Sequence, residues 1–399
     1  MTKLLDLKNN SVIAINQNNY TKEDNYKKVC YLDTDNITNN RINAFLKIDL
    51  TKEKLPSRAK RKCSLNSIIY SSVRPNQRHF GIIKEIPKNF LVSTAFIVMD
   101  IIDLKKLDPN YLYYYITQDK ITHYLQRIAE CGTSSYPSIT PLDFLNIKIK
   151  LYPLETQQKI ARTLSILDQK IENNHKINEL LHKILELLYE QYFVRFDFLD
   201  ENNKPYQTSG GKMKFSKELN RLIPSGWSVR FLNHKIVSTY QPKTISKTLL
   251  NDSYSYSVYG GGGIIGRFTE YNHEQSEFII SCRGQCGISY LTLPKSWITG
   301  NAMVIRPTKS YTSKTYLYHT IKKYKLTNYI TGSVQPQITR QNLSTMPILI
   351  PKRKTLNKWN NISSLLWNLI HNNMQSTQTL TALRDFLLPL LLKQQVKPK

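Results

Sequence analysis

Two long stretches of the chain carry apolar residues in alternating steps of three and four, which is the spacing of a coiled-coil seam. The first stretch lies in residues 153–199 and the second in residues 351–399. Each is predicted to be one helix of roughly 40 residues, about 60 Å long at 1.5 Å per residue. The seam positions are Ile160, Leu164, Leu167, Ile171, Leu181, Leu185, Leu188 and Tyr192 in the first stretch, and Trp359, Ile362, Leu366, Ile370, Leu380, Arg384, Leu387 and Leu391 in the second.

Polar residues interrupt each seam at its middle. They are Asn174 and Asn178 in the first helix and Asn373 and Thr377 in the second. Antiparallel pairing places Asn174 beside Thr377 and Asn178 beside Asn373, and any slip would bury an unpaired amide, so this layer is predicted to set the register. Parallel pairing would also match the layers, but two equal domains about a pseudo-twofold axis require antiparallel helices. The alternative is two unrelated amphipathic helices, each packed on its own domain.

The segments that lead into the two helices repeat each other. Residues 132–140 read GTSSYPSIT and residues 332–339 read GSVQPQIT, and each is followed by an apolar run that closes at a proline, Pro153 or Pro351. Solenoid repeats have periods of 20 to 50 residues, which is much shorter than the separation of these two copies. The chain is therefore interpreted as a duplicated domain plus helix, and its function is expected to occur at two sites.

The regions outside the helices read as two mixed α/β domains. In the first, residues 1–152, strands are predicted around 67–70 and 96–99 and helices around 111–117 and 121–128. A polar, glycine-containing linker is predicted over residues 200–222, and a second domain over residues 223–350. The predicted fold class is α+β, with two mixed domains related by pseudo-twofold symmetry and joined by two long antiparallel coiled-coil helices.

The charge of the chain is strongly positive. It has 56 Lys and Arg against 29 Asp and Glu, a net charge of +27. Candidate partners are therefore nucleic acid, acidic protein or an anionic membrane, with a lysine-rich composition alone as the alternative. The membrane is disfavoured because no apolar run approaches the length of a spanning helix and residues 1–6 lack a signal-peptide core.

The five cysteines are scattered along the chain. Cys282 and Cys286 are close together, but no second pair with zinc-ligand spacing accompanies them. All five are read as reduced thiols, so the expected location is the cytoplasm and no metal is expected on the chain.

Two short motifs suggest enzyme chemistry and are better explained otherwise. Residues 260–266 contain a formal G-x-G-x-x-G, but the segment before it alternates and the segment after it is not helical, so it is a glycine loop at a DNA groove or a plain hairpin turn. Asp108-Pro109-Asn110-Tyr111 is similar to the loop of amino-methyltransferases but lacks their second proline. It suits the start of a helix at Tyr111 with Asn110 or Asp108 as its cap. No nuclease, P-loop or Ser/His/Asp signature is found, so the chain is predicted to be non-catalytic.

Basic and amide side chains gather in predicted loops of both domains, and such side chains bind phosphates and the edges of guanine and adenine. For any one of them a solvated surface position is the alternative. The predicted DNA contacts are Arg58, Lys60, Arg61, Lys62, Arg74, Asn76, Gln77, Arg78, Ser135 and Tyr136 in the first domain, and Lys243, Lys247, Tyr259, Gly261, Gly262, Arg267, Arg283, Gln285, Gln335, Gln337 and Arg340 in the second.

Several motifs together resemble the specificity subunit of type I restriction–modification enzymes, and the likeness covers nearly the whole chain. They are the stretch 153–174, the linker segments 204–206 and 210–213, the Ile-Pro-x-Gly-Trp segment at 223–227 and the terminal segment 380–389. The resemblance implies that residues 1–152 and 223–350 are target-recognition domains. They would read the two halves of a bipartite double-stranded DNA site, while the helices set the length of an unread spacer.

The resemblance also implies partners. Two modification (methyltransferase) subunits would dock on the helices, and restriction subunits would join through them. S-adenosylmethionine, ATP and Mg would then be bound by the partner subunits and none by this chain. The first helix carries more apolar surface than a two-helix pair can bury, which usually marks a protein interface. We therefore expect Ile184, Leu187 and Phe193 to bind the modification subunit; packing on the adjacent domain is the alternative.

The chain departs from a symmetrical plan in two places. The first domain lacks the segment 223–227 and the glycine loop, so the two domains are expected to read different half-sites. The second helix begins with Lys352-Arg353-Lys354 where the first has Leu154-Glu155-Thr156. The competing functions are a self-contained DNA methyltransferase or nuclease, and a coiled-coil adaptor that binds acidic protein.

Overall fold

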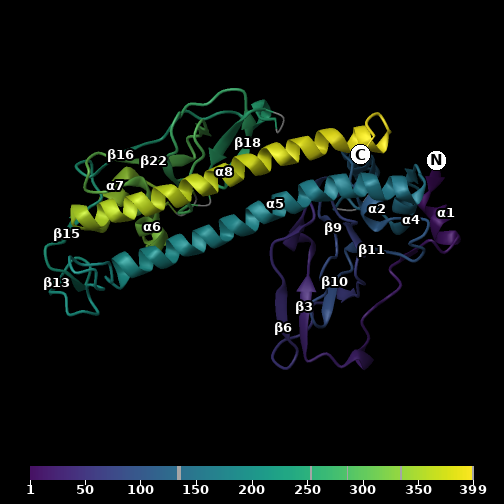
Figure 1. Cartoon of the computed structure of the whole chain (residues 1–399), viewed down its shortest axis with the longest axis horizontal. Helices are drawn as coiled ribbons and strands as arrows, with labels where there is room; N and C mark the ends of the chain where they lie inside the picture. Colours follow the sequence, from purple (N-terminus) through teal and green to yellow (C-terminus); the bar gives the residue numbers. More distant parts are fainter. Residues whose placement is uncertain (133–135, 252–253, 285, 333–334, 398–399) are drawn as a thin grey trace. The chain divides into compact units, whose positions relative to one another are not determined.

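The computed structural model describes residues 1–132, 136–251, 254–284, 286–332 and 335–397. The chain divides into two compact units (Figure 1). Unit 1 is Met1–Asn174 with Ser376–Lys399, and unit 2 is His175–Gln375. Each unit holds one α/β domain together with part of helix α5 (Leu154–Tyr189) and part of helix α8 (Arg353–Leu392). Among the described residues, no helix is long and apolar enough to cross a membrane.

The two domains contain the same four-stranded antiparallel sheet. In unit 1 its strand order is β2-β11-β8-β9, and in unit 2 it is β16-β22-β19-β20. The strands are β2 (Ile13–Ile15), β8 (Ile68–Ser71), β9 (Phe80–Ile82), β11 (Phe96–Ile101), β16 (Val237–Tyr240), β19 (Phe278–Ser281), β20 (Ser289–Leu291) and β22 (Ala302–Pro307). The central pairs, β8 with β11 and β19 with β22, are rich in buried β-branched and aromatic residues, which suit a covered sheet.

One helix in each unit packs on this sheet. In unit 1 it is α2 (Pro109–Ile116), and in unit 2 it is α6 (Lys314–Lys323). Helix α2 begins where Asp108 accepts a hydrogen bond of 2.8 Å from the backbone N–H of Tyr111, with a proline in the first turn. Of the two caps that the sequence allowed, Asp108 and Asn110, the structure therefore has Asp108.

The remaining elements differ between the units. Unit 1 adds a sheet of order β6-β3-β10-β7, in which β3 and β10 run parallel, and unit 2 adds a sheet of order β18-β17-β21. The other elements of unit 1 are β1 (Thr2–Lys3), α1 (Leu4–Asn9), η1 (Lys22–Asp24), β3 (Lys28–Leu32), η2 (Thr34–Asn36), β4 (Ile37–Thr38), β5 (Arg41–Ile42), β6 (Leu46–Asp49), β7 (Ala59–Arg61), η3 (Pro75–Gln77), β10 (Phe90–Ser93), α3 (Asp119–Glu130), α4 (Pro141–Leu145) and β12 (Lys148–Ile149). Those of unit 2 are the π-helix η4 (Glu190–Val194), β13 (Met213–Ser216), β14 (Arg221–Pro224), β15 (Ser228–Phe231), η5 (Lys247–Leu249), β17 (Tyr256–Gly260), β18 (Gly263–Phe268), β21 (Trp297–Ile298), η6 (Leu326–Tyr329), β23 (Ile330–Thr331), β24 (Gln337–Ile338), α7 (Arg340–Ser344) and β25 (Pro347–Ile350).

The long helices pair antiparallel within each unit. In unit 1 the side-chain amide of Asn174 donates to the hydroxyl of Thr377 at 3.2 Å. In unit 2 the amide of Asn373 donates to the side-chain oxygen of Asn178 at 2.8 Å. Both pairings are those predicted from the seams, and they confirm that the polar positions face each other. Their role in setting the register stays a prediction.

Two details of the sequence analysis are wrong. Ile362 is not in the seam, since it is exposed while its neighbour Ser363 is fully buried and hydrogen-bonds to Thr315. Residues 200–222 are also more than a polar linker, because β13 pairs with β14 to form an antiparallel hairpin that begins inside them.

Candidate nucleic-acid interface

In unit 1 the loop after β8 is joined to the repeated GTSSYPSIT segment. Val73 forms a β-bridge with Ser138, and the N–H of Arg74 donates to the carbonyl of Pro137 at 2.9 Å. The N–H of Ile139 donates to the carbonyl of Ser72 at 2.8 Å. The loop after β8 and the repeated segment, which lie about 60 residues apart in the chain, therefore form one surface.

This surface carries an exposed cation–aromatic pair. The Arg74 guanidinium lies 5.3 Å from the ring centre of Tyr136, and the Tyr136 residue is 62% exposed. An accessible aromatic ring beside an arginine can stack on bases and contact phosphate. The arrangement is suited to a nucleic acid.

The turn that follows Arg74 has an unusual backbone. Arg74 and Arg78, at its two ends, have φ angles of 47° and 57°, in the left-handed region that residues other than glycine adopt at a cost of about 1 kcal/mol or more each. Between them Pro75 is buried, while Asn76 and Gln77 are exposed. Backbone strain of this kind concentrates at binding and active sites.

Unit 2 builds the same junction at the end of β19. Arg283 forms a β-bridge with Gln337, and the N–H of Ile338 donates to the carbonyl of Cys282 at 3.0 Å. Ile338 is the counterpart of Ile139 in the repeat, and both donate to a residue just past the end of an equivalent strand. The repeat in the sequence therefore corresponds to a repeated surface.

Gly261 lets the β17–β18 hairpin come close to this second surface. A Cβ on Gly261 would lie 3.0 Å from the backbone oxygen of Arg283. The formal G-x-G-x-x-G is thus a hairpin whose turn lies against a predicted DNA-binding loop, and the structure has no strand–turn–helix unit there.

Two residues near Arg283 were missed by the sequence analysis. The Gln241 amide donates to the sulfur of Cys282 at 2.9 Å, and the Asn301 carbonyl accepts from the N–H of Cys282 at 3.0 Å. Both residues are exposed. In unit 1 the carbonyl of Ala95 accepts from the N–H of Ser72 at 2.8 Å in the same way. Residues 94–98 (TAFIV) and 300–304 (GNAMV) form a second, shorter repeat in the sequence, and this was the available signal.

Some of the basic side chains before β8 are exposed, and others form contacts within the domain. Arg58 and Lys60 are exposed, and the Arg58 carbonyl accepts from the N–H of Thr94 at 2.8 Å, next to the Ala95 contact with Ser72. Lys62 instead pairs with Asp24 at 2.6 Å, and this hydrogen bond raises the pKa of Lys62.

Arg61 is half-buried, donates to the Thr94 carbonyl at 3.4 Å, and has its pKa lowered by burial. Both Arg61 and Lys62 therefore also hold the domain together.

In unit 2 most of the predicted polar contacts are exposed. These are Lys243, Lys247, Gly262, Arg283, Gln335, Gln337 and Arg340. Arg267 is half-buried and donates to the carbonyls of Ser255, at 2.5 Å, and Tyr254. Ser135 and Gln285 lie outside the described residues.

Two predicted contact residues are buried and cannot be contact residues. Tyr259 is 2% exposed, and its hydroxyl accepts from the N–H of Leu293 at 3.1 Å. Phe193 is 3% exposed and packs against Tyr316, with ring centres 4.7 Å apart. Both belong to the core of unit 2, so Tyr259 is corrected as a DNA contact and Phe193 as a partner contact.

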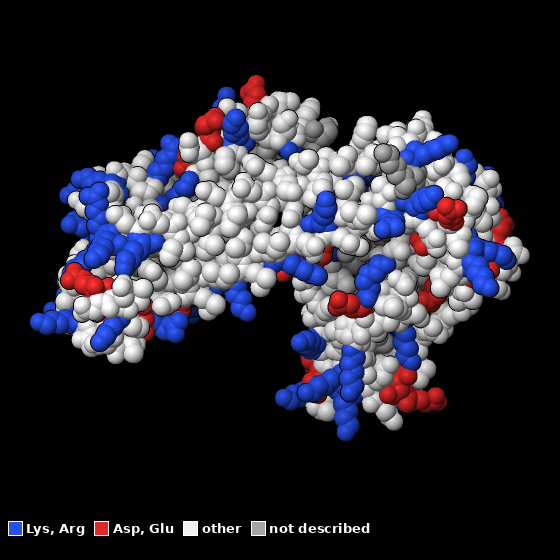
Figure 2. Space-filling view, in the orientation of Figure 1, with Lys and Arg blue, Asp and Glu red and all other residues white. Residues whose placement is uncertain are grey.

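Helix α5 carries a second apolar stripe beside the seam. Ile177, Leu180, Ile184 and Leu187 follow each other in steps of three, four and three, and all lie in unit 2. Ile184 is 45% exposed and Leu187 is 56% exposed. Figure 2 shows mostly uncharged atoms over the helices of unit 2, whereas Lys and Arg gather over β13 and β15. An exposed heptad stripe is suited to a helical partner.

The described residues contain no group of three His, Cys, Asp or Glu side chains that could hold a metal ion. A cavity of about 180 Å³ lies in unit 1 between α2, the start of α3 and the end of α8. Its charged lining residues are Arg78, Asp119, Lys120, Asp168, Arg384, Asp385 and Lys393.

Comparison with known proteins identifies the family of the chain. A family model described as the type I restriction modification DNA specificity domain matches residues 6–183 and 224–383. The HindI specificity subunit of Haemophilus influenzae is 22% identical, over 93% of this chain and 95% of that protein. The MjaIX specificity subunit of Methanocaldococcus jannaschii is 24% identical, over 71% of this chain and 68% of that protein.

A solved structure supports the fold. The type I restriction–modification S subunit from M. genitalium superposes with a TM-score of 0.56 at 17% identity, covering 98% of this chain and 99% of that one. The two matches to the family model together span most of the residues, and each includes one of the repeated domains. The chain therefore belongs to the family of type I restriction–modification DNA specificity subunits.

Proposed function

We propose that this chain is the DNA-recognition subunit of a type I restriction–modification complex and that each unit reads one half of a bipartite site in double-stranded DNA. The repeated surface is the observation that carries the proposal. In each unit a loop with exposed arginine or amide side chains follows a buried strand. This loop forms a β-bridge with the repeated segment that runs from Gly132 to Thr140 in unit 1 and from Gly332 to Thr339 in unit 2, called the Gly-to-Thr segment. Two such surfaces on one chain suit two half-sites.

The helices are proposed to set the length of the unread spacer. Each unit contains a paired section of α5 and α8, and the hydrogen bonds at Asn174 and Asn178 define the pairing in both units. A coiled coil with a polar layer resists sliding, since a slip would leave amides unpaired. The separation of the half-sites would therefore be a property of helix length.

The second apolar stripe of α5 is proposed to bind a modification subunit, and restriction subunits would join through that subunit. Replacing Ile184 and Leu187 with Asp should abolish co-purification with the modification subunit, because carboxylates in an apolar interface lose hydration without gaining a partner. Leu222→Asp is the matched control, since Leu222 is 54% exposed in the same unit but lies on the β13–β14 hairpin. Unchanged assembly of the double variant would refute the interface.

The chain itself is proposed to transfer no methyl group and to cut no DNA. In this proposal S-adenosylmethionine, ATP and Mg are bound by the partner subunits, and the complex acts in the cytoplasm. Turnover by the purified chain alone would favour the alternative of a self-contained methyltransferase or nuclease.

The decisive experiment is methylation-site sequencing of DNA from cells with and without the chain and its modification subunit. A bipartite methylated site that depends on the chain is expected. Arg74→Ala and Arg283→Ala form a matched pair, and each should weaken discrimination only at its own half-site, by roughly 5- to 150-fold if the side chain makes a good base contact.

The adaptor alternative predicts different behaviour. Several phosphate contacts would make DNA affinity fall steeply between about 50 and 200 mM salt. A flat salt titration, together with no chain-dependent methylation, would overturn the proposed function and favour an acidic protein as the partner.

A further inference from the structure

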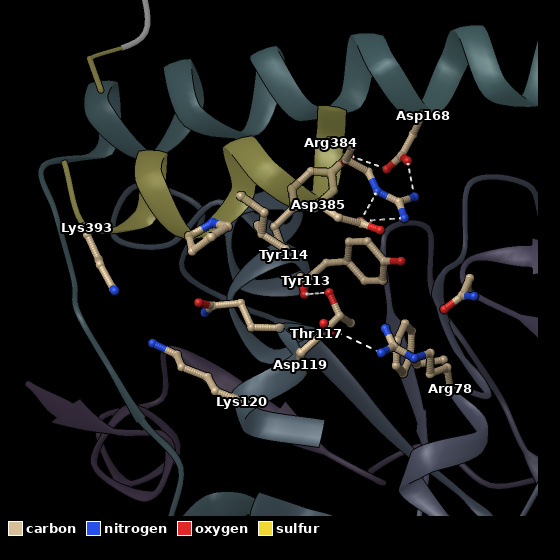
Figure 3. Close-up of a pocket in the computed structure, with 15 residues that line it drawn as sticks. Arg78, Tyr113, Tyr114, Thr117, Asp119, Lys120, Asp168, Arg384, Asp385 and Lys393 are labelled. Carbon is tan, nitrogen blue, oxygen red and sulfur yellow. Dashed lines mark hydrogen bonds and ion pairs between the residues drawn. The ribbon is translucent and has the colours of Figure 1, made fainter. Parts of the chain in front are cut away.

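Two side chains of helix α3 form hydrogen bonds with the loop that carries Asn76 and Gln77. The side-chain oxygen of Gln126 accepts from the backbone N–H of Asn76 at 3.1 Å. At the end of the loop the Arg78 guanidinium donates to the carboxylate of Asp119 at 2.8 Å, as Figure 3 shows. Gln126 and Asp119 are not among the predicted DNA contacts, and both stabilise the loop through contacts within the domain.

The amide of Gln126 is fixed at both of its ends. Its nitrogen donates to the carboxylate of Glu130 at 2.8 Å, one turn further along α3, while its oxygen faces the loop. The residue is 9% exposed. A carboxylate accepts but does not donate, so Glu130 determines which end of the Gln126 amide faces the N–H of Asn76.

The loop needs this support because its backbone is strained. Arg74 and Arg78 both have left-handed φ angles, and a strained turn relaxes when the contacts that over-determine it are removed. Reading a base edge requires donor and acceptor atoms at defined positions, whereas a phosphate contact tolerates movement. Relaxation of the loop would therefore lower the selectivity for base sequence more than the overall affinity for DNA.

We propose that Gln126 and Asp119 are positioning residues for the first half-site. They hold Asn76 and Gln77 so that these two exposed amides can meet base edges, and they touch no DNA themselves. The inference rests on the proposed function and adds to it which residues determine how precisely one half-site is read. Of the two, Gln126 carries the larger effect because it is buried, whereas the Asp119 side chain is 67% exposed and its ion pair is weak.

The equivalent loop of unit 2 is held by different contacts. The Cys286 thiol donates to the carbonyl of Pro336 at 3.1 Å, and a Cβ on Gly287 would lie 3.1 Å from the Leu326 side chain. No described glutamine performs the role of Gln126 there. A change at Gln126 should therefore affect one half-site and leave the other as an internal control.

The test uses the full chain in complex with its modification subunit. Wild-type methylation sequencing first defines the two half-sites, and pools of DNA with one half randomised at a time then measure discrimination at each half. Gln126→Met removes the acceptor and keeps the length of the side chain. We expect discrimination at the first half-site to fall by about tenfold, the size of a weakened base contact, with the second half-site unchanged.

A paired substitution provides the rescue. Gln126→Glu combined with Glu130→Gln keeps an acceptor toward Asn76 and a hydrogen bond between the two side chains, so it should restore selectivity at the first half-site. Failure of this variant to restore selectivity would overturn the assignment, as would wild-type selectivity in Gln126→Met. Equal losses at both half-sites would show a general folding defect and would also overturn it.

The same measurements separate this inference from the proposed function. If the wild-type complex shows no selectivity at either half-site, the proposed function fails and the inference fails with it. If the wild-type complex is selective and Gln126→Met is equally selective, only the positioning role of α3 is refuted.

Discussion

The seam between the helices in unit 1 contains a charged network whose energetic contribution can be measured. Arg384 on α8 donates to the carboxylate of Asp168 on α5 at 2.8 Å, and Asp168 also accepts from the hydroxyl of Tyr114 on α2 at 2.6 Å (Figure 3). The side chains of Arg384 and Asp168 are each 20% exposed. Burial acts to lower the pKa of Arg384, but the charges of Asp168 and Asp385, together with their hydrogen bonds to the guanidinium, outweigh burial and raise it.

Arg384→Leu should destabilise unit 1 by about 3 kcal/mol, the lower end of the range for removing one partner of a buried ion pair, because the site keeps some contact with water. Asp168→Leu combined with Arg384→Leu should recover most of this loss, since no buried charge is then left alone. About 1 kcal/mol should remain for the Tyr114 hydroxyl, which Tyr114→Phe measures separately.

Urea denaturation can assign the change to one unit. All four tryptophans, Trp227, Trp297, Trp359 and Trp367, lie in unit 2, so tryptophan fluorescence follows that unit while far-UV circular dichroism follows both. We expect Arg384→Leu to shift the dichroism transition more than the fluorescence transition. Asp385→Ala is the control, because Asp385 is 55% exposed. The reasoning is refuted if Arg384→Leu costs less than about 0.5 kcal/mol, a typical surface value, or if the double variant is no more stable than the single one.

Two further predictions concern acid stability and the spacer. Burial lowers the pKa of His319 to about 3 and that of His371 to about 4, so protonation favours the unfolded chain. The stability of unit 2 should therefore be fully present above about pH 6.5 and fall as the pH drops toward 3, by at most about 1.4 kcal/mol per pH unit for each histidine. A fluorescence-monitored unfolding midpoint that does not change between pH 7 and 5 would exclude this. Inserting seven residues into both helices, near Asn174 and Asn373, should lengthen the spacer by about three base pairs at 1.5 Å per residue, and methylation at the original spacing would rule out the helices as a ruler.

The sequence predicted local periodicity and repetition well. The polar layer could be located because the heptad pattern specifies which residues face the partner helix, and both predicted pairs, Asn174 with Thr377 and Asn178 with Asn373, form hydrogen bonds. Likewise, the two copies of the Gly-to-Thr segment predicted that both domains carry an equivalent surface. Each of these inferences depends on neighbours in sequence or on an internal copy.

Burial and long-range contacts could not be predicted in the same way. Tyrosine and phenylalanine are residue types that often contact a partner, but the packing of segments distant in sequence places both Tyr259 and Phe193 in the core of unit 2. No sequence pattern marks Gln126 as functional, because glutamine is common on the polar face of an amphipathic helix. Its role depends on a turn that is 50 positions away in the chain.

The two junctions between domain and helices are chemically different although the sequence repeat makes them equivalent. Trp367 takes the place of Asp168 in unit 2, and its ring lies 5.3 Å from Tyr318 and 5.0 Å from His182. Leu185 takes the place of Arg384, so the ion pair of unit 1 is replaced by aromatic and apolar packing.

This difference bears on which helices pair. If the first half of one chain paired with the first half of another, Asp168 would face Leu185 in place of Arg384, and a carboxylate would be buried without a guanidinium. Pairing of the first half with the second half, so that Asp168 faces Arg384, avoids that cost. The ion pair is therefore expected to contribute more to the choice of partner helix than to net stability, and the near-neutral double substitution predicted above is the result that this interpretation requires.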